Sequence, residues 1–204
     1  MQPGLKVLSA SPLFKWVRQE MVSRYGEASS SGLWDQAAML YEKLRETYKG
    51  DPKKVRFHTE KNIFIGVALY TTLMKEHPLD AMPIMQAGMK TGGLRAAKTL
   101  AKLMRLPGSS RLFIGFFPIL CKKFFGQASG FQQKFYLTEK HSARMDILKC
   151  PYCKYCLELG CPELTPLFCE NDDYVYGNVS GIRFTRTQTL GKGGDRCDFL
   201  MERY

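Results

Sequence analysis

The stretch FQQKFYLTEKHSARMDILK, residues 131–149, decides the fold class of this chain. Residues 131–138 and 143–148 have the aromatic and aliphatic content that is typical of strands. The polar triplet Glu139-Lys140-His141 between them predicts a turn. The sequence therefore changes here from helical patterns to an antiparallel hairpin.

On the N-terminal side of this hairpin the sequence predicts helices up to about residue 125. Ser11-Pro12 is a helix start, with serine as the N-cap and proline at the first helical position, and Gly26 is expected to end that helix. Gly92-Gly93 is expected to break a later helix into two. Apolar residues at helical spacing predict further helices at 34–50, 62–76, 79–90, 94–105 and 111–125.

On the C-terminal side the sequence predicts two short helices and two more strands. The helices are expected at 151–159 and 166–176, and the strands at 179–190 and 197–203. This order predicts an α+β fold, in which an antiparallel sheet carries helices on one face. We expect a single domain over residues 1–204, with a helical part (1–128) and a sheet-containing part (129–204).

The composition is typical of a soluble globular protein. The chain has 204 residues, of which 45% are hydrophobic and 24% are charged. The first thirty residues contain no uninterrupted apolar segment, so we expect no secretory signal. Seven cysteines, an odd number, are typical of reduced thiols in the absence of such a signal. We therefore predict a cytoplasmic protein.

The net charge of +11 is unevenly distributed. Residues 1–130 carry 20 Lys and Arg against 9 Asp and Glu, whereas residues 131–204 carry 10 of each. No acidic residue lies between Asp80 and Glu139. Such a basic segment suits nucleic acid, an anionic membrane, an acidic substrate or simply a solvated helical face. No zinc-finger spacing or paired aromatic strand motif accompanies it, so we predict no nucleic-acid partner.

The longest apolar run, LFIGFFPILC at residues 112–121, is too short to span a bilayer. At helical spacing Phe113, Phe117, Cys121 and Phe124 fall on one stripe, which favours packing over the sheet. We predict that the helix at 111–125 is mostly buried, with Lys122 and Lys123 at its solvated end, and that the chain makes no stable membrane insertion.

The segment CPYCKYC, residues 150–156, has four interpretations. Followed by Cys161-Pro162, it reads C-x2-C-x2-C-x4-C-P, one residue longer than an iron–sulfur ferredoxin run. A zinc site would need a second well-spaced pair of ligands. CPYC also resembles the glutaredoxin dithiol, although only 48 residues follow Cys156 to complete that fold. The fourth interpretation is a helix start at Pro151, where the helix dipole lowers the pKa of the Cys150 thiol.

A second group of candidate residues lies further along the chain. In the segment PELTPLFCENDDYVYGN, Cys169 and Asp173 are four residues apart on one helical face, with Asp172 beside them. In RTQTLGKGGDRCDFLMER, Asp195, Cys197 and Asp198 follow two glycines, and strand alternation sends Cys197 and Asp198 to opposite faces. Asp195 and Asp198 also fit structural roles, Asp195 as the end of a Gly-Gly turn and Asp198 as a surface residue.

Together these segments resemble the L-2-amino-thiazoline-4-carboxylic acid hydrolase family. The residues that carry the resemblance are Cys150-Pro151-Tyr152, LGCPELTPLFCENDD, Thr187-x-Thr189-Leu190 and GGDRCDF at 193–199. The resemblance covers residues 131–203 and implies hydrolysis of the cyclic isothiourea 2-amino-thiazoline-4-carboxylate to N-carbamoyl-cysteine. The order of helices and strands is also similar to the ligand-binding fold of vinyl-reductase-like and vesicle-tethering domains.

Hydrolysis of such a ring assigns roles to the candidate residues. Cys150 or Cys169 is a candidate nucleophile, with water as the alternative. Carboxylates grip an amidinium and orient water, and an arginine binds a carboxylate. His141 in the hairpin turn is the nearest imidazole, and no cofactor or metal is required. The predicted catalytic residues are Cys150, Cys169, Asp173, Asp195, Cys197 and Asp198, and the predicted substrate-binding residues are Arg183, Arg186, Thr187 and Thr189.

These residues lead to three functional hypotheses. The first is a hydrolase of small cyclic amidines, and for it we expect Cys150, Cys169, Asp173, Asp195 and Cys197 to line one pocket. The second is a non-catalytic sensor or adaptor that binds a small molecule. The third is a metal–thiolate protein that uses the cysteine cluster. The sequence predicts a small-molecule partner and does not predict an oligomeric state.

Overall fold

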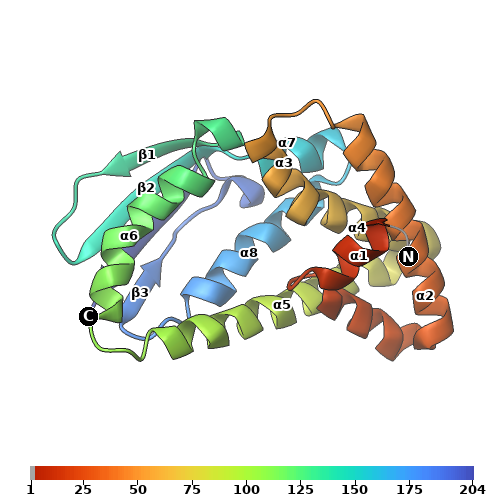
Figure 1. Ribbon diagram of the computed structural model, residues 1–204, viewed down its shortest axis with the longest axis horizontal. Coiled ribbons are helices and arrows are strands. Elements are labelled where there is room, and N and C mark those ends of the chain that lie inside the picture. Colours follow the sequence, from red (N-terminus) through yellow and green to blue (C-terminus); the bar gives the residue numbers. More distant parts are fainter. Residues whose placement is uncertain (1–2) are drawn as a thin grey trace.

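Helices form most of the chain that the computed structural model describes, residues 3–204, and the strands begin at residue 132 (Figure 1). Short helical turns η1 (Thr59–Ile63), η2 (Gln127–Ser129), η3 (Pro162–Leu164) and η4 (Leu190–Lys192) join the longer elements. The helices are α1 (Pro3–Ala10), α2 (Lys15–Thr47), α3 (Lys53–His58), α4 (Phe64–Glu76), α5 (Pro78–Leu103), α6 (Ser109–Phe124), α7 (Pro151–Glu158) and α8 (Thr165–Tyr176). The strands are β1 (Gln132–Tyr136), β2 (Ser142–Lys149), β3 (Ile182–Thr185) and β4 (Cys197–Arg203).

The four strands form one antiparallel sheet in the order β1-β2-β4-β3. In the central pair, Met145 lies opposite Phe199 and Ile147 opposite Cys197. Because side chains alternate along a strand, these four residues share one face of the sheet. The predicted α+β class and the predicted β1–β2 hairpin are confirmed.

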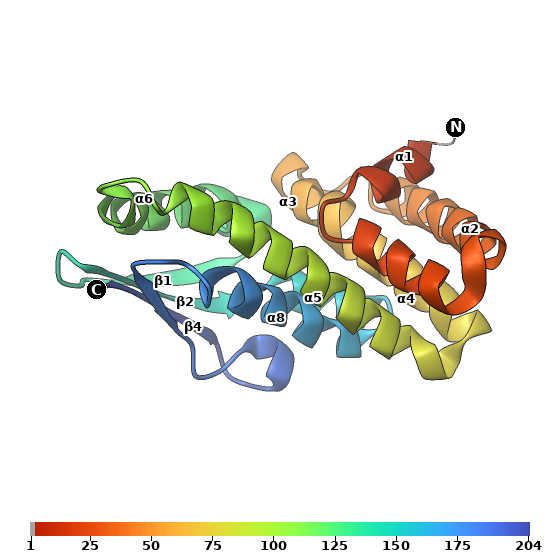
Figure 2. The same ribbon diagram turned by 90° about the horizontal axis from the view of Figure 1, so that it is seen from below.

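The helices cover that one face of the sheet. Ile114 and Phe117 of α6 are buried in the same cluster as Met145, Phe199 and Met201. Figure 2 shows α6 lying over the sheet, with α5 and α8 beside it. On the opposite face Arg144 is exposed, and Asp146 is covered by the side chains of Tyr136 and Arg196. The face of the sheet that carries Cys197 is therefore the face that the helices cover.

The structure has two apolar cores, and each of them contains residues from both the N-terminal and the C-terminal part of the chain. Tyr155, Cys156 and Leu164, which follow the β1–β2 hairpin, are buried among the N-terminal helices. Conversely, α6 contributes Phe117 to the core of the sheet. The expected division at residue 128 is therefore a change of secondary structure along the chain, and it does not separate the two cores.

The expected helix break at Gly92-Gly93 is wrong, because α5 is continuous through both glycines. They provide close contact with neighbouring elements. A Cβ atom on Gly92 would stand 2.9 Å from the backbone oxygen of Leu13, and one on Gly93 would stand 2.8 Å from Oδ1 of Asn171. In the helix these glycines let α5 approach the chain before α2 and the side of α8.

Two further expectations are corrected. The expected helix end at Gly26 is a kink within α2, where φ is 76° and ψ is 170°. The expected strand at 179–190 is shorter, because β3 ends at Thr185. Beyond it the amides of Thr187 and Gln188 donate to the carboxylate of Asp198, so they are not available to pair with a strand.

The expectation that the helix at 111–125 is mostly buried is also wrong. α6 buries Ile114, Phe117 and Cys121 against the sheet. The exposed fractions of its outward residues are 60% for Leu112, 55% for Phe116, 59% for Ile119 and 49% for Leu120. Among residues 3–204, none of the helices combines the length and the apolarity that a bilayer crossing requires.

Close contact between α5 and α2 predicts the effect of an alanine on stability. A Cβ on Gly88 would stand 2.5 Å from the backbone N and Cα of Val17. Because backbone cannot move aside like a flexible side chain, we expect Gly88→Ala to lower the free energy of unfolding by about 1–3 kcal/mol. Gly32→Ala in α2, where nothing lies within 4 Å, is the matched control and should stabilise by about 0.5–1 kcal/mol. Urea unfolding compares the two, and equal effects would contradict this helix contact.

Candidate active site

A cavity of about 300 Å³ lies between the sheet and helices α6, α7 and α8. Aromatic and aliphatic side chains form much of its wall, including Phe117, Phe131, Met145, Phe168 and Phe199. The polar and thiol-bearing residues of the wall are Asn62, Cys121, Cys150, Tyr152, Cys169, Asn171, Asp172, Tyr176 and Cys197. The cavity therefore presents a small set of reactive groups in apolar surroundings, which is the usual make-up of a ligand site.

Cys169 of α8 is the thiol whose surroundings favour the anion. The Cys197 thiol, the Thr189 hydroxyl, the Arg186 guanidinium and the Gly191 amide together lower its pKa to about 6, against the effect of burial. Thr189 is well oriented for this role, because its oxygen accepts from the Lys192 amide at 3.2 Å and its O–H remains to donate. Cys169 is thus a thiolate at neutral pH.

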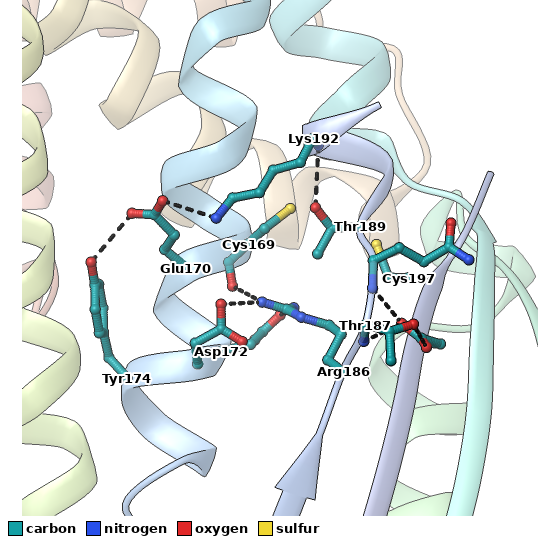
Figure 3. A network of polar contacts seen from close by, with 12 residues as sticks. Cys169, Glu170, Asp172, Tyr174, Arg186, Thr187, Thr189, Lys192 and Cys197 are labelled. Atoms are coloured by element: carbon teal, nitrogen blue, oxygen red, sulfur yellow. Dashed lines mark hydrogen bonds and ion pairs between the residues drawn. The ribbon is translucent and has the colours of Figure 1, made fainter. Parts of the chain in front are cut away.

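The loop η4 approaches the Cys169 sulfur very closely. A Cβ atom on Gly191 would stand 2.9 Å from Sγ of Cys169 and 2.9 Å from Cγ2 of Thr165. The glycine in the family-like segment TLGKGG therefore lets a backbone amide reach the thiolate, in the manner of an anion site built from main-chain donors. Figure 3 shows the sulfur of Cys169 directed toward the loop that carries Thr189.

Cys197 acts as a hydrogen-bond partner of that thiolate. Its pKa is raised, first by its hydrogen bond to Cys169 and then by burial. The Leu190 amide donates to its sulfur at 3.3 Å. Thr189, Gly191 and Arg186 all favour the anion at Cys169, so the shared negative charge lies there and Cys197 keeps its proton.

Asp172 lies one helical turn after Cys169 on the cavity side of α8. Burial raises the pKa of this carboxyl to about 7, and the neighbouring Cys169 and Asp173 add to the effect, while Arg186 opposes it. Its side chain keeps 37% of its accessible surface because it faces the cavity. A carboxyl with a pKa near neutrality is suited to general acid–base catalysis. The sequence prediction chose the adjacent Asp173 and missed Asp172.

Arg186 ties this part of α8 to the chain after β3 (Figure 3). Its side chain is only 3% exposed. Nη1 lies 3.3 Å from Oδ2 of Asp172, and Nη2 lies 2.6 Å from Oδ2 of Asp173 and donates to the Cys169 carbonyl at 2.8 Å. Both Nη atoms are thus engaged within the protein. We predicted Arg186 to bind substrate, but its geometry is that of a positioning residue.

Three other predicted residues shape the loop from 186 to 196. Asp198 accepts hydrogen bonds from Thr187 N at 2.9 Å, Thr187 Oγ1 at 2.6 Å and Gln188 N at 2.9 Å. Partial burial acts to raise the pKa of Asp198, but these hydrogen bonds lower it. Asp198 and Thr187 therefore fix the start of the loop, and Thr189 alone of the three reaches the thiolate.

The remaining predicted residues lie outside the cavity wall. Asp173 is 44% exposed and bound to Arg186. Asp195 is 74% exposed and pairs with its neighbour Arg196. Arg183 is exposed on β3, and His141 lies near the end of β4, where its Nδ1 is 2.6 Å from the Arg203 guanidinium. Of the five residues expected in one pocket, the structure brings together Cys150, Cys169 and Cys197.

The cysteines of CPYCKYC do not act as one cluster. Cys150 is the N-cap residue of α7 and hydrogen-bonds to Cys153. This hydrogen bond and burial raise the pKa of Cys150, so the predicted thiolate at Cys150 is wrong. Cys156 hydrogen-bonds to Cys161 inside the helical core. Within residues 3–204 no three His, Cys, Asp or Glu side chains are grouped so as to hold a metal ion.

A histidine that the sequence analysis overlooked contacts Tyr152, a residue of the cavity wall. His58 at the end of α3 is buried, which lowers its pKa. Its Nε2 lies 2.7 Å from the Phe124 carbonyl, an acceptor, so Nε2 carries the proton and Nδ1 accepts from the Tyr152 hydroxyl at 3.3 Å. Tyr152 also hydrogen-bonds to Asn62, which the π-helical turn η1 directs into the cavity.

A second hollow adjoins the cavity and shares Leu13, Asn62 and Asn171 with it. Its wall carries two cations, Lys15 and Arg95. The Arg95 guanidinium lies 4.0 Å over the centroid of the Trp16 ring, and this cation–π contact uses the face of the guanidinium and not its N–H groups. An anionic group of a ligand in the cavity would find its counter-charge here.

The surroundings of Cys169 predict a measurable reactivity. We expect Cys169 to be alkylated by iodoacetamide with a pH midpoint near 6, and Thr189→Val to raise that midpoint by about one unit, because a donor to the anion is lost. Thr185→Val on exposed β3 is the matched control and should leave it unchanged. Mass spectrometry of the Cys169 peptide follows the rate. Titration of Cys169 near pH 8.5 in the unmodified protein would contradict this assignment.

Comparison with known proteins agrees with the motifs around this cavity. The sequence profile described as L-2-amino-thiazoline-4-carboxylic acid hydrolase matches residues 56–201. The searches of curated proteins and of solved structures returned no match. The matched segment contains Asn62, Tyr152, Cys169, Asp172 and Cys197 together with β1, β2, β3 and most of β4. The chain belongs to the L-2-amino-thiazoline-4-carboxylic acid hydrolase family.

Proposed function

We propose that this protein hydrolyses a small cyclic amidine or isothiourea, such as 2-amino-thiazoline-4-carboxylate, with Cys169 as the nucleophile. The observation that carries the proposal is the pair formed by Cys169, with a pKa near 6, and Asp172, with a pKa near 7, on one turn of α8 inside the cavity. A nucleophile beside a group that exchanges protons near neutral pH is the arrangement that covalent hydrolysis needs.

The first step is attack of the Cys169 thiolate on C2, the amidine carbon of the ring. The Asp172 carboxyl, still largely protonated at pH 6–7, gives its proton to the ring sulfur as the bond from C2 to that sulfur breaks. The opened substrate then carries a free thiol and is bound to Cys169 through C2. Low-dielectric walls strengthen each of these charge interactions.

In the second step water attacks C2, and Asp172, now a carboxylate, takes a proton from that water. The bond from C2 to the Cys169 sulfur breaks, which restores the thiolate and releases the N-carbamoyl product. The net reaction is addition of one water to the ring. Cys197, Thr189 and Gly191 stabilise the thiolate as a leaving group, since the same contacts lower its pKa.

The substrate carboxylate points toward the second hollow in this proposal. The cavity wall is built from neutral and acidic residues within the described chain, whereas Arg95 and Lys15 stand in the adjoining hollow. Asn62 and Asn171 belong to both spaces and contact the substrate between its ring and its carboxylate. Arg95 thus takes the role that the sequence analysis gave to Arg183 or Arg186. We place the reaction in the cytoplasm, supported by seven free cysteines in the described residues.

A non-catalytic ligand-binding role is the second candidate, and the apolar wall favours it. Phe117, Phe131 and Phe199 suit a ligand with an apolar body better than a small zwitterion. Under this alternative the unmodified protein binds a ligand with an apolar body, releases it unchanged, and does not turn over the cyclic amidine. The assay of turnover below separates the two functions.

Two variants test the catalytic pair. Incubated with 2-amino-thiazoline-4-carboxylate, the unmodified protein should release thiol, which Ellman's reagent detects. Cys169→Ser should lose at least about 10³-fold in kcat/KM, and Asp172→Asn about 10²- to 10⁴-fold. Asp173→Asn is the matched control, because it also pairs with Arg186 but lies outside the cavity, and it should lose less than about tenfold. Full activity of Cys169→Ser would leave water as the nucleophile and refute the covalent step.

A third variant tests the orientation of the substrate. Arg95→Met keeps the apolar stem and the stacking length but removes the charge. We expect KM to rise roughly tenfold with little change in kcat, because a charge-assisted contact made equally in ground and transition states is lost. Arg183→Met on the exposed face of β3 is the control and should leave KM unchanged. A fall in kcat alone for Arg95→Met would argue against a carboxylate site in the second hollow.

A further inference from the structure

The outward face of α6 is an apolar surface that the described chain leaves uncovered. Leu112, Phe116, Ile119 and Leu120 recur at helical spacing, and each exposes about half or more of its surface, from 49% to 60%. Figure 2 shows α6 as the outermost element over the sheet. Since its inward face already packs on the sheet, this outward face is free to contact something else.

Neighbouring elements extend the same surface. Phe124 at the end of α6 is 39% exposed, and its ring lies 6.0 Å from that of Phe57, which is 50% exposed on α3. At the other end, Leu103 and Leu106 are 59% and 63% exposed in the segment that leads into α6. Exposed apolar groups that gather in this way mark interaction sites more often than scattered ones do.

Basic side chains surround this apolar surface. Arg111 and Lys122 lie along one flank of α6, and Lys123 lies at its C-terminal end. Arg105 is exposed before α6, and Lys53 and Lys54 stand one turn before Phe57 on α3. None of these six residues forms an ion pair with an acidic side chain of residues 3–204. From residue 81 to residue 138 the sequence contains no acidic residue that would offset them.

We propose that this surface, formed by the outward face of α6 with Phe57, docks the protein onto an anionic lipid bilayer. An apolar stripe flanked by Lys and Arg is the make-up of a helix that lies in the membrane interface. The apolar side chains would enter the headgroup boundary while the basic side chains meet lipid phosphates. This is attachment at the surface and does not require a spanning helix.

Charge favours the bilayer over a second copy of the chain. A symmetric dimer through this face would bring two sets of unneutralised basic side chains together. Like charges in such a contact cost energy, whereas an anionic bilayer neutralises them. The proposal stands on the surface alone and does not depend on the catalytic role of Cys169. It replaces our sequence-based expectation that α6 is a core helix with a small solvated end.

The test is flotation of the full chain with vesicles of phosphatidylcholine, with or without phosphatidylserine. We expect the protein to float with the anionic vesicles, to stay behind with pure phosphatidylcholine, and to be released as salt is raised. Phe116→Ser combined with Ile119→Ser should abolish flotation, and Arg111→Gln combined with Lys122→Gln should lower the partition coefficient roughly tenfold or more.

Leu79→Ser is the matched control, since Leu79 is 93% exposed at the distant start of α5 and should float as the unmodified protein does. All these positions are exposed, so thermal unfolding should be little changed. Light scattering after gel filtration accompanies the assay. A dimer that Phe116→Ser with Ile119→Ser dissociates, in a protein that does not float, would overturn the proposal in favour of self-association. Flotation that is equal on both vesicle types, or absent in a monomer, would overturn it as well.

Discussion

The buried guanidinium of Arg186 is the interaction on which the candidate site depends. It joins the chain after β3 to α8 through two carboxylates and the Cys169 carbonyl, with only 3% of the side chain exposed. A buried ion pair gives little net stability compared with apolar packing, but removing one partner leaves the others uncompensated. Its value here is placement, because it fixes the loop that carries Thr189 and Gly191 against the sulfur of Cys169.

The charge of Arg186 acts in the same direction on both neighbours, and their other contacts give them different protonation states. Arg186 favours the anion at both Cys169 and Asp172, yet the two cannot be anionic without repelling each other. Cys169 receives additional hydrogen bonds from Cys197, Thr189 and Gly191 and takes the negative charge. Asp172 lies at the cavity wall with one contact to the arginine, so burial keeps its proton up to about pH 7. Two neighbouring groups are thereby tuned to different roles.

The sequence predicted much of this fold, because strand and helix patterns depend on local residue order. The strand Cys197–Arg203 and the helix start at Pro151 have the predicted bounds. Gly92 and Gly93 misled the prediction, since a glycine that breaks a helix and one that admits a neighbouring backbone look alike until the neighbour is known. Asp172, which lines the cavity, was not chosen over Asp173 for a similar reason. Both fit one helical face near Cys169, and only the position of the cavity distinguishes them.

Local sequence patterns could not identify the cavity residues in the N-terminal half of the chain. Asn62, Arg95 and the supporting His58 lie far from the cysteines in sequence, and long-range packing brings them to the site. α6 shows most clearly what sequence composition does not determine, because a helix of the same apolar composition can lie in a core or form an exposed surface. Phe117 and Phe116 are adjacent in sequence, but the first lines the cavity and the second faces outward. One helix thus forms a wall of the candidate site and, on its other side, a surface that residues 3–204 leave uncovered.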